Sequence, residues 1–446
     1  MPTRAAELLT DIYRAAVRGA DAGVAVAEAL ADVEFRAGSR PWLLAMGKAA
    51  HTMSQAAVAS LAARGIAPLG GVVVGAHDER SPHELLESAT GEHPLPGSQS
   101  FKAAERIGVI VARVRPEDEV LVLLSGGGSS LAAAPVDGIE ADDLVALNAT
   151  LLGSGADIVV MNSVRKRFSR WAAGRLARAL APARVICLIV SDVHNDDPTF
   201  VASGPCSPDP LFAADVEELL TEHALVELLP PRMRAQLQAV KRGEAPETPK
   251  PGDPVFEHVT RRVILGNTHA LQAAAARATA LGIRPVYISR EPILDSAVRT
   301  GEMLAAELLR FADGGLHRVN DPAPFACMLW GGETTVTLGD GETGLGGRCQ
   351  ELALAAARAL HAAGPRAHGV SLLAAGTDGR DGPTEAAGAI VDWKTWSAIR
   401  AAGRDAERDL AGHDAYHAFD AVGALVRTGH SGTNVRDVVV GLVTPS

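Results

Sequence analysis

The sequence is poor in aromatic residues and in cysteine. Phe, Trp and Tyr together make up 4% of its 446 residues, and it has four cysteines, Cys187, Cys206, Cys327 and Cys349. These cysteines lie far apart and form no CxxC pair, so neither a disulfide framework nor a zinc knuckle is expected. This usage fits a reducing compartment, and we expect the protein to act in the cytoplasm.

Long apolar runs and basic clusters are also missing. Charged residues interrupt the N-terminal helical pattern, and no run of about 18 apolar residues follows, so neither a secretory signal nor a membrane span is expected. The formal charge of −11 and the pI near 5.7 disfavour binding to a phosphate backbone. We therefore expect small-molecule partners, no nucleic acid and no membrane, with the chain acting as a monomer or homodimer.

The residues that are abundant indicate an α/β protein of two domains. Hydrophobic residues make up 47% of the chain, and apolar runs alternate with Ala-rich helical patterns, which is typical of βα repeats in a parallel sheet. The Pro- and Gly-rich segment 241–254 is predicted to be an exposed connector between domains 1–240 and 255–446. Strands are predicted near 42–46, 71–75, 120–124, 185–190, 262–266, 285–289, 326–330, 334–338, 370–374 and 438–442, and helices at about 48–64, 99–113, 141–153, 157–180 and 211–224.

One buried strand runs directly into three glycines and two hydroxyls, at Ser125-Gly126-Gly127-Gly128-Ser129-Ser130. Glycines let the backbone approach a ligand and turn N–H groups toward it, and the serine hydroxyls can donate further hydrogen bonds. The segment is predicted to hold an anion, with a tight βα turn as the alternative.

An earlier strand ends in Gly47-Lys48, which places a lysine at the start of a helix. In open α/β sheets this edge is where ligands bind, and an ammonium there can offset phosphate or carboxylate charge. The spacing does not match a P-loop. A solvated helix-start lysine is the alternative.

Acidic residues follow another strand, beginning with Asp192 and including Asp197. Clustered carboxylates suit Mg²⁺, and an aspartate there can instead accept the proton of an attacking hydroxyl. Helix caps and turns are the ordinary alternative for aspartates at strand ends.

The second half has two comparable segments. In the segment from Gly344 to Glu351, Arg348 is predicted to lie at the start of a helix, where its guanidinium can bind phosphoryl or carboxylate oxygens through two hydrogen bonds. A surface ion pair with Glu351 is the alternative. The stretch from Thr377 to Thr384 contains Asp378 and Asp381, which are candidates for metal or ribose hydroxyls or for simple Asp-Gly turns. His413 and His417, four apart, are interpreted as a solvated helical face rather than a metal site.

Taken together, these motifs resemble the class II glycerate 2-kinases, a family with a MOFRL C-terminal region whose members are often named hydroxypyruvate reductases. The resemblance covers almost the whole chain and rests on LLSGGGSSL at 123–131, NSVRKRFS at 162–169, SDVHNDDPTFVASGPCSPDP at 191–210, GGETTV at 331–336, GGRCQELALAAA at 346–357 and AAGTDGRDGPTEAAGAIVD at 374–392. It implies a Rossmann-like doubly wound parallel sheet followed by a second α/β domain, an active site in the interdomain cleft, and ATP and Mg²⁺ as co-substrates.

The resemblance also implies roles for individual residues. Lys48, Arg348 and Asp192 are expected to be catalytic, and Asp192 and Asp197 to bind the metal. Substrate or phosphate contacts are expected from Ser125, Gly126, Gly127, Gly128, Ser129, Ser130, Arg165, Glu333 and Thr334, and nucleotide contacts from Gly266, Asn267, Gly346, Gly347, Thr377 and Asp378. The chain departs from the family pattern at Arg167-Phe168, His194-Asn195, Cys349 and His430-Ser431, which affects acceptor specificity more than phosphoryl chemistry.

The expected reaction is ATP-dependent phosphorylation of the 2-hydroxyl of D-glycerate. A kinase for a related hydroxy acid is one alternative, and an NAD(P)H-dependent hydroxypyruvate reductase is another. The reductase needs a dinucleotide fingerprint, and Gly47-Lys-Ala-Ala-His lacks its second glycine. A non-catalytic sensor of sugar acids would keep a pocket but would not need clustered carboxylates beside two cations.

Overall fold

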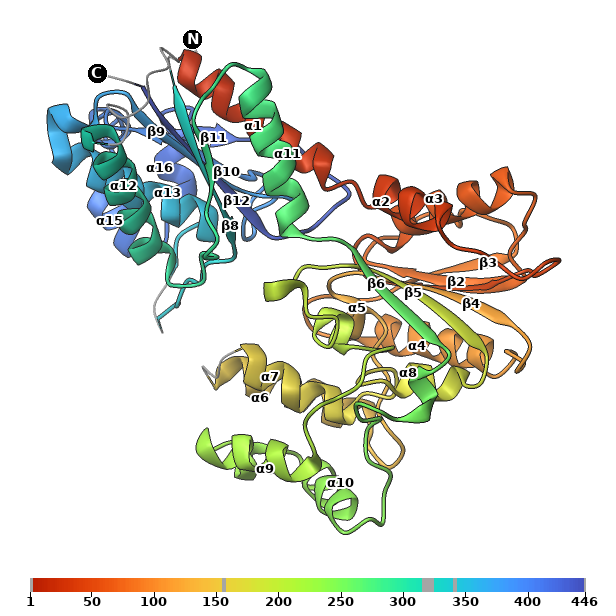
Figure 1. Ribbon diagram of the computed structural model, residues 1–446. Coiled ribbons are helices and arrows are strands. Elements are labelled where there is room, and N and C mark those ends of the chain that lie inside the picture. Colours follow the sequence, from red (N-terminus) through yellow and green to blue (C-terminus); the bar gives the residue numbers. More distant parts are fainter. Residues whose placement is uncertain (1–2, 155–157, 315–324, 340–342, 445–446) are drawn as a thin grey trace. The chain divides into compact units, whose positions relative to one another are not determined.

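A computed structural model describes residues 3–154, 158–314, 325–339 and 343–444. The chain forms two compact units, which we call the Lys48 unit, residues 22–264, and the Arg348 unit, residues 1–21 with 265–446. Each unit contains one six-stranded sheet. The two-domain α/β prediction is therefore confirmed (Figure 1).

The sheet of the Lys48 unit has the strand order of dinucleotide-binding folds, β3-β2-β1-β4-β5-β6. The pairs β3–β2, β2–β1, β1–β4 and β4–β5 are parallel, and Trp42 lies opposite both Gly70 and Val120. The strands of this unit are β1 (Trp42–Met46), β2 (Gly70–Gly75), β3 (Leu86–Thr90), β4 (Glu119–Leu124), β5 (Arg184–Val190) and β6 (Val259–Leu265).

Helices lie on both faces of this sheet, with α2 and α3 on one and α4 and α8 on the other (Figure 1). Strands β1 and β4 are buried along their whole length, which explains their continuous apolar sequence. A smaller core forms among α6, α7, α9 and α10. The helices of this unit are α2 (Ala22–Ala31), α3 (Ala50–Ala63), α4 (Ser98–Val111), α5 (Gly128–Leu131), α6 (Ala141–Gly153), α7 (Ile158–Arg165), α8 (Arg175–Leu180), α9 (Ala213–Glu222) and α10 (Pro231–Lys241).

The sheet of the Arg348 unit is mixed, in the order β11-β10-β9-β12-β8-β7. Only β7–β8 is parallel among its described pairs, because β9–β10, β9–β12, β8–β12 and β10–β11 all run antiparallel. The prediction of parallel βα repeats is therefore wrong here, since β9 and β10 are joined by a loop too short for a crossover helix. The strands are β7 (Val286–Ile288), β8 (Ala326–Gly332), β9 (Val370–Gly376), β10 (Gly388–Asp392), β11 (Leu425–Val426) and β12 (Asp437–Val443).

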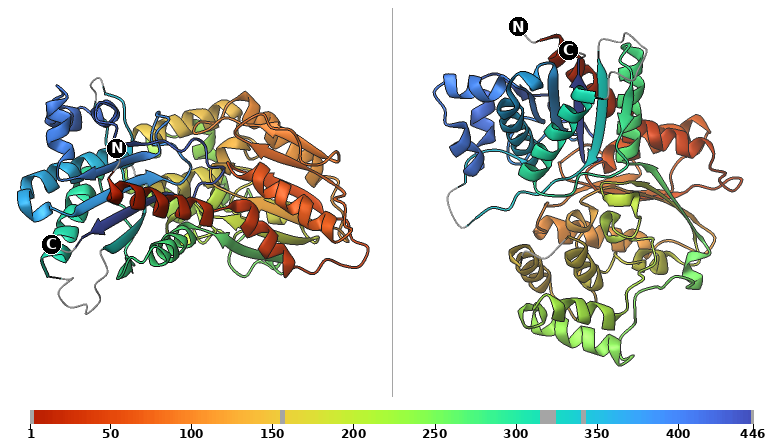
Figure 2. Two further views of the ribbon diagram at one scale, coloured as in Figure 1. Left: turned by 90° about the horizontal axis from the view of Figure 1, so that it is seen from above. Right: turned by 60° about the vertical axis from the view of Figure 1, so that its left-hand side comes forward.

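Helices also cover both faces of the second sheet, as the two views of Figure 2 let the reader follow. The main core of the unit lies on the face of α12 and α13. The helices are α1 (Arg4–Gly19), α11 (Asn267–Ala280), α12 (Ala297–Gly314), α13 (Arg348–Ala363), α14 (Thr395–Ala401), α15 (Ala406–Ala411) and α16 (Ala415–Asp420).

Helix α1 belongs to the Arg348 unit although it begins the chain, which differs from the predicted division at 1–240. Its amphipathic sequence buries Leu9, Ile12 and Tyr13. The Tyr13 hydroxyl donates to the Gly376 carbonyl at 2.6 Å, and Arg277 of α11 bonds to Asp11 at 2.5 Å.

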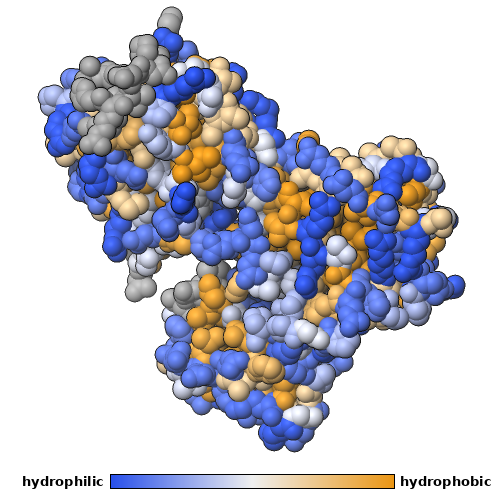
Figure 3. Space-filling model, in the orientation of Figure 1, coloured by the Kyte–Doolittle hydropathy of each residue, from blue (hydrophilic) through white to orange (hydrophobic). Residues whose placement is uncertain are grey.

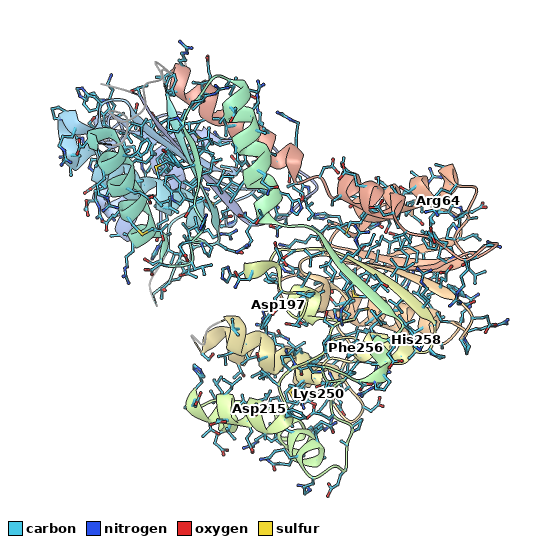
Figure 4. All side chains as sticks on the ribbon, viewed as in Figure 1. Arg64, Asp197, Asp215, Lys250, Phe256 and His258 are labelled. Carbon is cyan, nitrogen blue, oxygen red and sulfur yellow. The ribbon has the colours of Figure 1, made fainter. Side chains whose placement is uncertain are left out.

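The segment 241–254 also differs from its prediction, because it is part of the Lys48 unit rather than an exposed connector. Thr248 is buried, and its hydroxyl lies 3.0 Å from Oδ2 of the buried Asp209. Asp209 in turn pairs with the buried Lys166 at 2.8 Å. Lys250, labelled in Figure 4, bonds to Thr248 at 2.8 Å, so a buried charge network holds the segment in place.

Three predicted elements need correction. The strand predicted at 262–266 is β6, which joins the first sheet rather than the second. The strand predicted at 334–338 is absent, because the chain leaves the sheet at Gly332 and forms only an isolated bridge at Thr335. The helix predicted at 157–180 is broken after Phe168, since Gly174 adopts a left-handed conformation before α8 begins; residue 157 lies outside the described residues.

Hydrophilic side chains dominate the face shown in Figure 3, with smaller apolar patches among them. Within the described ranges, none of the helices combines the length and the apolar character that crossing a membrane requires.

Candidate active site

The strand order of the first sheet reverses direction at β1 and β4, which lie side by side in the sheet. The carboxyl ends of parallel strands on either side of such a switch point form the usual ligand site of open α/β sheets. Here these ends lead into Gly47-Lys48 and into the loop Ser125–Ser130. The structure thus brings the predicted lysine and the predicted glycine loop to one place.

These two segments hold each other by hydrogen bonds. Ser125 N donates to the Met46 carbonyl at 3.1 Å, and Lys48 N donates to the Gly126 carbonyl at 2.9 Å. The Ser125 hydroxyl accepts from Ala49 N at 3.0 Å. A Cβ on Gly47, whose φ is +132°, would lie 2.1 Å from Ser125 Oγ, so only glycine permits this approach.

The loop keeps backbone donors available. Within the described part of the chain, the amide N–H groups of Gly126 and Gly127 make no hydrogen bond to protein. Gly127 has a left-handed φ of +79° and is the residue immediately before the short helix α5. The Ser130 hydroxyl, in contrast, donates a hydrogen bond to the Pro94 carbonyl at 2.8 Å. The loop therefore has backbone amides that are not used by the protein, and Ser130 holds the neighbouring segment through Pro94; anion binding by this loop stays a prediction.

Asp192 lies against the same loop. A Cβ on Gly126 would fall 1.8 Å from Asp192 Oδ2, so the absence of a side chain at position 126 makes room for this carboxylate. Asp197, labelled in Figure 4, lies in the loop after β5, and its Oδ1 accepts from Thr199 N at 2.9 Å. Among the described residues, no three His, Cys, Asp or Glu side chains are grouped as a metal site.

Lys48 is exposed, and no ion pair with a described acidic residue engages its ammonium. Arg165, at the end of α7, has a buried Nε without a hydrogen-bond partner, and burial lowers the pKa of its guanidinium. No described contact joins Arg165 to the glycine loop.

His93 also approaches the loop, and no sequence motif predicted it. A Cβ on Gly127 would lie 2.9 Å from His93 Cδ2. His93 follows β3, a strand that the sequence pattern failed to predict, so its place at this edge of the sheet was not foreseeable.

In the Arg348 unit a second polar cluster surrounds Arg348, the first residue of α13. Asp437 at the start of β12 binds its guanidinium through two bonds of 2.6 and 2.8 Å, and Glu333 lies 3.3 Å away. Burial lowers the pKa of Arg348, but the Asp437 charge and hydrogen bonds outweigh this effect and raise it. Arg348 therefore stays charged and has a fixed orientation. Asp437 was not predicted, because a single acidic residue before an apolar run carries no specific signal.

Asp381 caps the same helix. Its carboxylate accepts from Cys349 N at 3.1 Å and Gln350 N at 2.8 Å, and a Cβ on Gly347 would lie 2.3 Å from it. Burial, with the nearby Asp437 charge, raises the pKa of Asp381 to about 7. The structure thus gives Asp381 a helix-capping position, which differs from the simple Asp-Gly turn considered from the sequence.

Several residues expected to contact nucleotide have polar groups that are engaged within the protein. The Asn267 amide donates to the carbonyls of Val435 and Asp437 at 2.8 and 3.0 Å. The Thr377 hydroxyl donates to the Arg436 carbonyl at 2.6 Å and accepts from Val435 N at 2.9 Å. These side chains hold the loop before β12 in place.

The remaining predicted site residues of this unit differ in their neighbours and hydrogen bonds. Gly266 is the residue before α11 and Gly346 lies near His413. Asp378 Oδ1 accepts from Arg380 N at 3.0 Å. Thr334 is buried, and its hydroxyl has no hydrogen-bond partner.

The two histidines four residues apart form separate acid pairs. His413 Nδ1 lies 2.7 Å from Glu351 Oε2, and His417 Nδ1 lies 2.5 Å from Asp414 Oδ1.

Of the residues at which the sequence departs from the family pattern, Cys349 is buried, which raises the pKa of its thiol. His194 and Asn195 form a short turn in which Asn195 has a left-handed φ of 59°.

The strand order of the first sheet, with a lysine and a glycine-rich loop at its switch point, defines an α/β protein of nucleotide-binding architecture. Two family models match the chain, a domain of unknown function (DUF4147) at residues 8–238 and the MOFRL family at residues 326–437. The chain is 34% identical over 446 residues to a D-glycerate 2-kinase of Thermotoga maritima, covering 99% of both proteins. It is 34% identical over 411 residues to a glycerate 2-kinase of Pyrococcus horikoshii, covering 92% of this chain and 89% of that protein.

A protein of Agrobacterium vitis that is provisionally named a hydroxypyruvate reductase is 39% identical over 434 residues, with 97% of this chain and 93% of that protein covered. The crystal structure of a glycerate kinase from Thermotoga maritima matches with a TM-score of 0.83 at 34% identity, covering 98% of this chain and 99% of that one. The chain belongs to the class II glycerate 2-kinase family and is a kinase.

Proposed function

We propose that this protein transfers the γ-phosphoryl group of ATP to the 2-hydroxyl of D-glycerate, giving 2-phosphoglycerate and ADP. The observation that carries the proposal is the switch-point loop of the Lys48 unit, where an exposed ammonium, two unbonded backbone amides and the Asp192 carboxylate meet. Phosphoryl transfer depends mainly on positioning and on charge stabilisation, and these groups supply both.

In the Lys48 unit, we assign binding of an anionic oxygen to the amides of Gly126 and Gly127, with Ser129 beside them. Lys48 offsets the negative charge of that group. Arg165 adds a second cation whose Nε is unpaired. Asp192 accepts the proton of the acceptor hydroxyl or holds Mg²⁺, with Asp197 as a further carboxylate.

The residues present fit Mg²⁺ shared with ATP. Mg²⁺ usually binds through one or two carboxylates together with substrate phosphates, so a cluster of three protein ligands is not required. The Asp192 carboxylate beside the glycine loop meets that need. When bound there, the ion would neutralise phosphate charge.

In the Arg348 unit, we assign phosphate binding to Arg348, Thr334 and the backbone of Gly346 and Gly347. The Glu333 carboxylate, which would repel a phosphate, pairs with Arg348 at 3.3 Å and competes with the ligand for that guanidinium. Asp437 fixes the guanidinium in one orientation, in which Nη1, the nitrogen that Asp437 does not bind, lies 3.3 Å from Glu333. Asp378 and Gly266 are proposed nucleotide contacts. The engaged side chains of Asn267 and Thr377 support positioning roles for those two residues.

The rival activity is reduction of hydroxypyruvate with NAD(P)H, which the name of one relative suggests. The first sheet has a dinucleotide-binding order, but the turn after β1 contains only Gly47 and then Lys48. The backbone of Gly47 packs against Ser125, so a pyrophosphate has no room to approach the backbone of that turn. This observation favours the kinase.

We further propose a cytoplasmic setting, because all four cysteines are free and buried.

Two coupled assays on the purified chain test the proposal. ADP release should depend on D-glycerate, and hydroxypyruvate should cause no NAD(P)H oxidation. Lys48→Ala should remain folded by circular dichroism and lose about 10²- to 10³-fold in kcat/KM, because an anion-stabilising donor is removed. A wild-type rate in folded Lys48→Ala would refute the assignment of Lys48. Absence of ADP release with every three- and four-carbon hydroxy acid would favour a sensor.

A further inference from the structure

The segment that follows β3 is docked onto the glycine loop at three points. A Cβ on Gly91 would lie 2.0 Å from the Leu131 carbonyl oxygen, so backbone touches backbone there. The Ser130 hydroxyl binds the Pro94 carbonyl at 2.8 Å. Between these contacts, the His93 ring lies against Gly127. The imidazole is therefore held at a fixed place beside the proposed anion site.

The opposite side of this segment is anchored to helix α4. Glu92 accepts from Ser100 N at 2.8 Å and from Gln99 N at 3.2 Å, so its carboxylate is turned to the start of that helix. The two neighbours of His93 are therefore both held by hydrogen bonds, Glu92 to the start of α4 and Pro94 to Ser130, and these bonds fix the backbone position of His93.

The His93 ring has unused hydrogen-bonding capacity. Within the described residues neither ring nitrogen has a hydrogen-bond partner, and the residue is exposed to solvent. A neutral imidazole carries one donor and one acceptor, so both remain available to a ligand that enters from solvent. The aliphatic part of Lys48 shares the space beside Gly127 that His93 borders.

Desolvation, together with the Lys48 charge, keeps the His93 ring neutral. The surrounding protein withdraws the ring from bulk water, and this desolvation, with repulsion from the Lys48 ammonium, lowers the pKa of His93 to about 4. Two carboxylates are near in the structure, but Glu92 caps α4 and Asp192 lies against Gly126. At neutral pH His93 therefore contributes a dipole and Lys48 the positive charge.

We propose that His93 is a substrate-binding residue, whose neutral imidazole donates a hydrogen bond to the same oxyanion that Lys48 and the amide of Gly127 bind. The oxyanion is the carboxylate of the acid substrate or the transferring phosphoryl group. This inference rests on the proposed kinase function and adds a residue that the sequence motifs did not contain. If His93 donates this hydrogen bond, binding of the oxyanion depends on the direction of that bond as well as on the Lys48 charge.

Steady-state kinetics test the contact and distinguish the two oxyanions. His93→Ala should lower kcat/KM by about 10- to 100-fold, the range for one hydrogen bond to a charged group. A rise confined to KM for D-glycerate assigns the contact to the carboxylate, and a fall in kcat assigns it to the phosphoryl group. His93→Gln, which keeps an N–H donor, should recover part of the loss.

His51→Gln is the matched control. His51 is a histidine in the same unit whose pKa is also lowered by burial, but its ring is bonded to Ser88 at 2.9 Å. This variant should leave the kinetic constants within about twofold of wild type. Equal losses in His51→Gln and His93→Ala would overturn the proposal, as would unchanged kinetics in folded His93→Ala.

A titration of the unmodified chain tests the contact even if the variants fail to fold or the chain proves to have no kinase activity. The His93 ring signal, followed by NMR against pH, should show a midpoint near 4 in the free protein. Saturating inorganic phosphate or D-glycerate should raise that midpoint, because a bound oxyanion stabilises the imidazolium. A midpoint that neither ligand moves would overturn the proposal, whereas loss of kinase activity with a retained shift would contradict only the proposed reaction.

Discussion

The two cations proposed for catalysis are held in opposite ways. Lys48 is exposed and has no described ion pair, and its backbone alone is fixed, through the Gly126 carbonyl. Arg348 is bound by Asp437 through two hydrogen bonds and has Glu333 at 3.3 Å. One unit thus offers a flexible ammonium beside rigid backbone donors, and the other offers a rigid guanidinium.

The difference indicates how each cation can respond to a ligand. Lys48 can follow an oxyanion that changes position during transfer, because its ammonium is on a long side chain and no described ion pair fixes it. Arg348 recognises only a group that arrives in the orientation that Asp437 leaves open. We therefore expect substitutions near Lys48 to affect turnover with little effect on folding, and substitutions at Arg348 to affect both.

The largest effect is expected from Gly126→Ala. The new methyl group would overlap the Asp192 carboxylate, and because that obstacle is the end of a side chain, the carboxylate should move while the loop survives. Displacing it should lower kcat/KM by about 10²-fold or more, as is typical for losing one catalytic group. Measurement of kcat/KM together with circular dichroism checks this.

Gly153→Ala serves as the control for that substitution. Nothing described lies within 4 Å of a Cβ at Gly153, so this variant should keep wild-type activity. If Gly126→Ala is equally active, the Asp192 carboxylate does not contribute to turnover.

Arg348→Ala should cost stability as well as activity. The substitution leaves Asp437, whose side chain is 2% exposed, without its cation, and breaking such a pair costs about 3 kcal/mol. Denaturant unfolding measures the change. The double variant Arg348→Ala/Asp437→Asn should recover much of the stability without recovering activity; a single variant as stable as wild type would show that Arg348 is as loosely held as Lys48.

Asp381 should make the stability of the Arg348 unit depend on pH. Its pKa of about 7 lies above the ordinary value of 3.8, so between these values the folded chain binds more protons than the unfolded chain. The free energy of unfolding should therefore fall as pH rises from about 4 to about 7, by on the order of 4 kcal/mol, because each pKa unit corresponds to about 1.4 kcal/mol. Denaturant unfolding across that range should show a flatter profile for Asp381→Asn, and identical profiles would contradict the shift.

The smallest effect is expected from Glu333→Gln. Its carboxylate is 44% exposed and belongs to the weaker of the two Arg348 contacts, so stability should change by less than about 0.5 kcal/mol. Freeing one guanidinium nitrogen should lower KM for the ligand by about twofold to threefold if Arg348 binds it. An increase in KM would indicate instead that Glu333 itself contacts the ligand.

The sequence predicted the Lys48 unit better than the Arg348 unit. Buried parallel strands such as β1 and β4 are continuous apolar runs ending in glycine, and their ends identified Lys48 and the glycine loop directly. Strand β3 is short and partly exposed, so neither it nor His93 after it could be predicted. The mixed order of the second sheet depends on long-range pairing, which local periodicity does not report.

Side-chain partners were the least predictable part of the site. The motif around Arg348 gave the residue but not Asp437, 89 residues away, which fixes its orientation. Likewise, the composition of 241–254 indicated a linker, yet Thr248 within it is buried beside Asp209. In both cases a tertiary contact overrides a local pattern.

Helix α1 has a consequence for synthesis of the chain. Its apolar stripe packs in the Arg348 unit, most of which begins only at Leu265. During translation this stripe is made before the residues from 265 onward, and it stays without its partners while the Lys48 unit is completed and can fold on its own. The nascent polypeptide therefore exposes an amphipathic helix during that interval, and a chaperone that shields such helices should raise the yield of native protein.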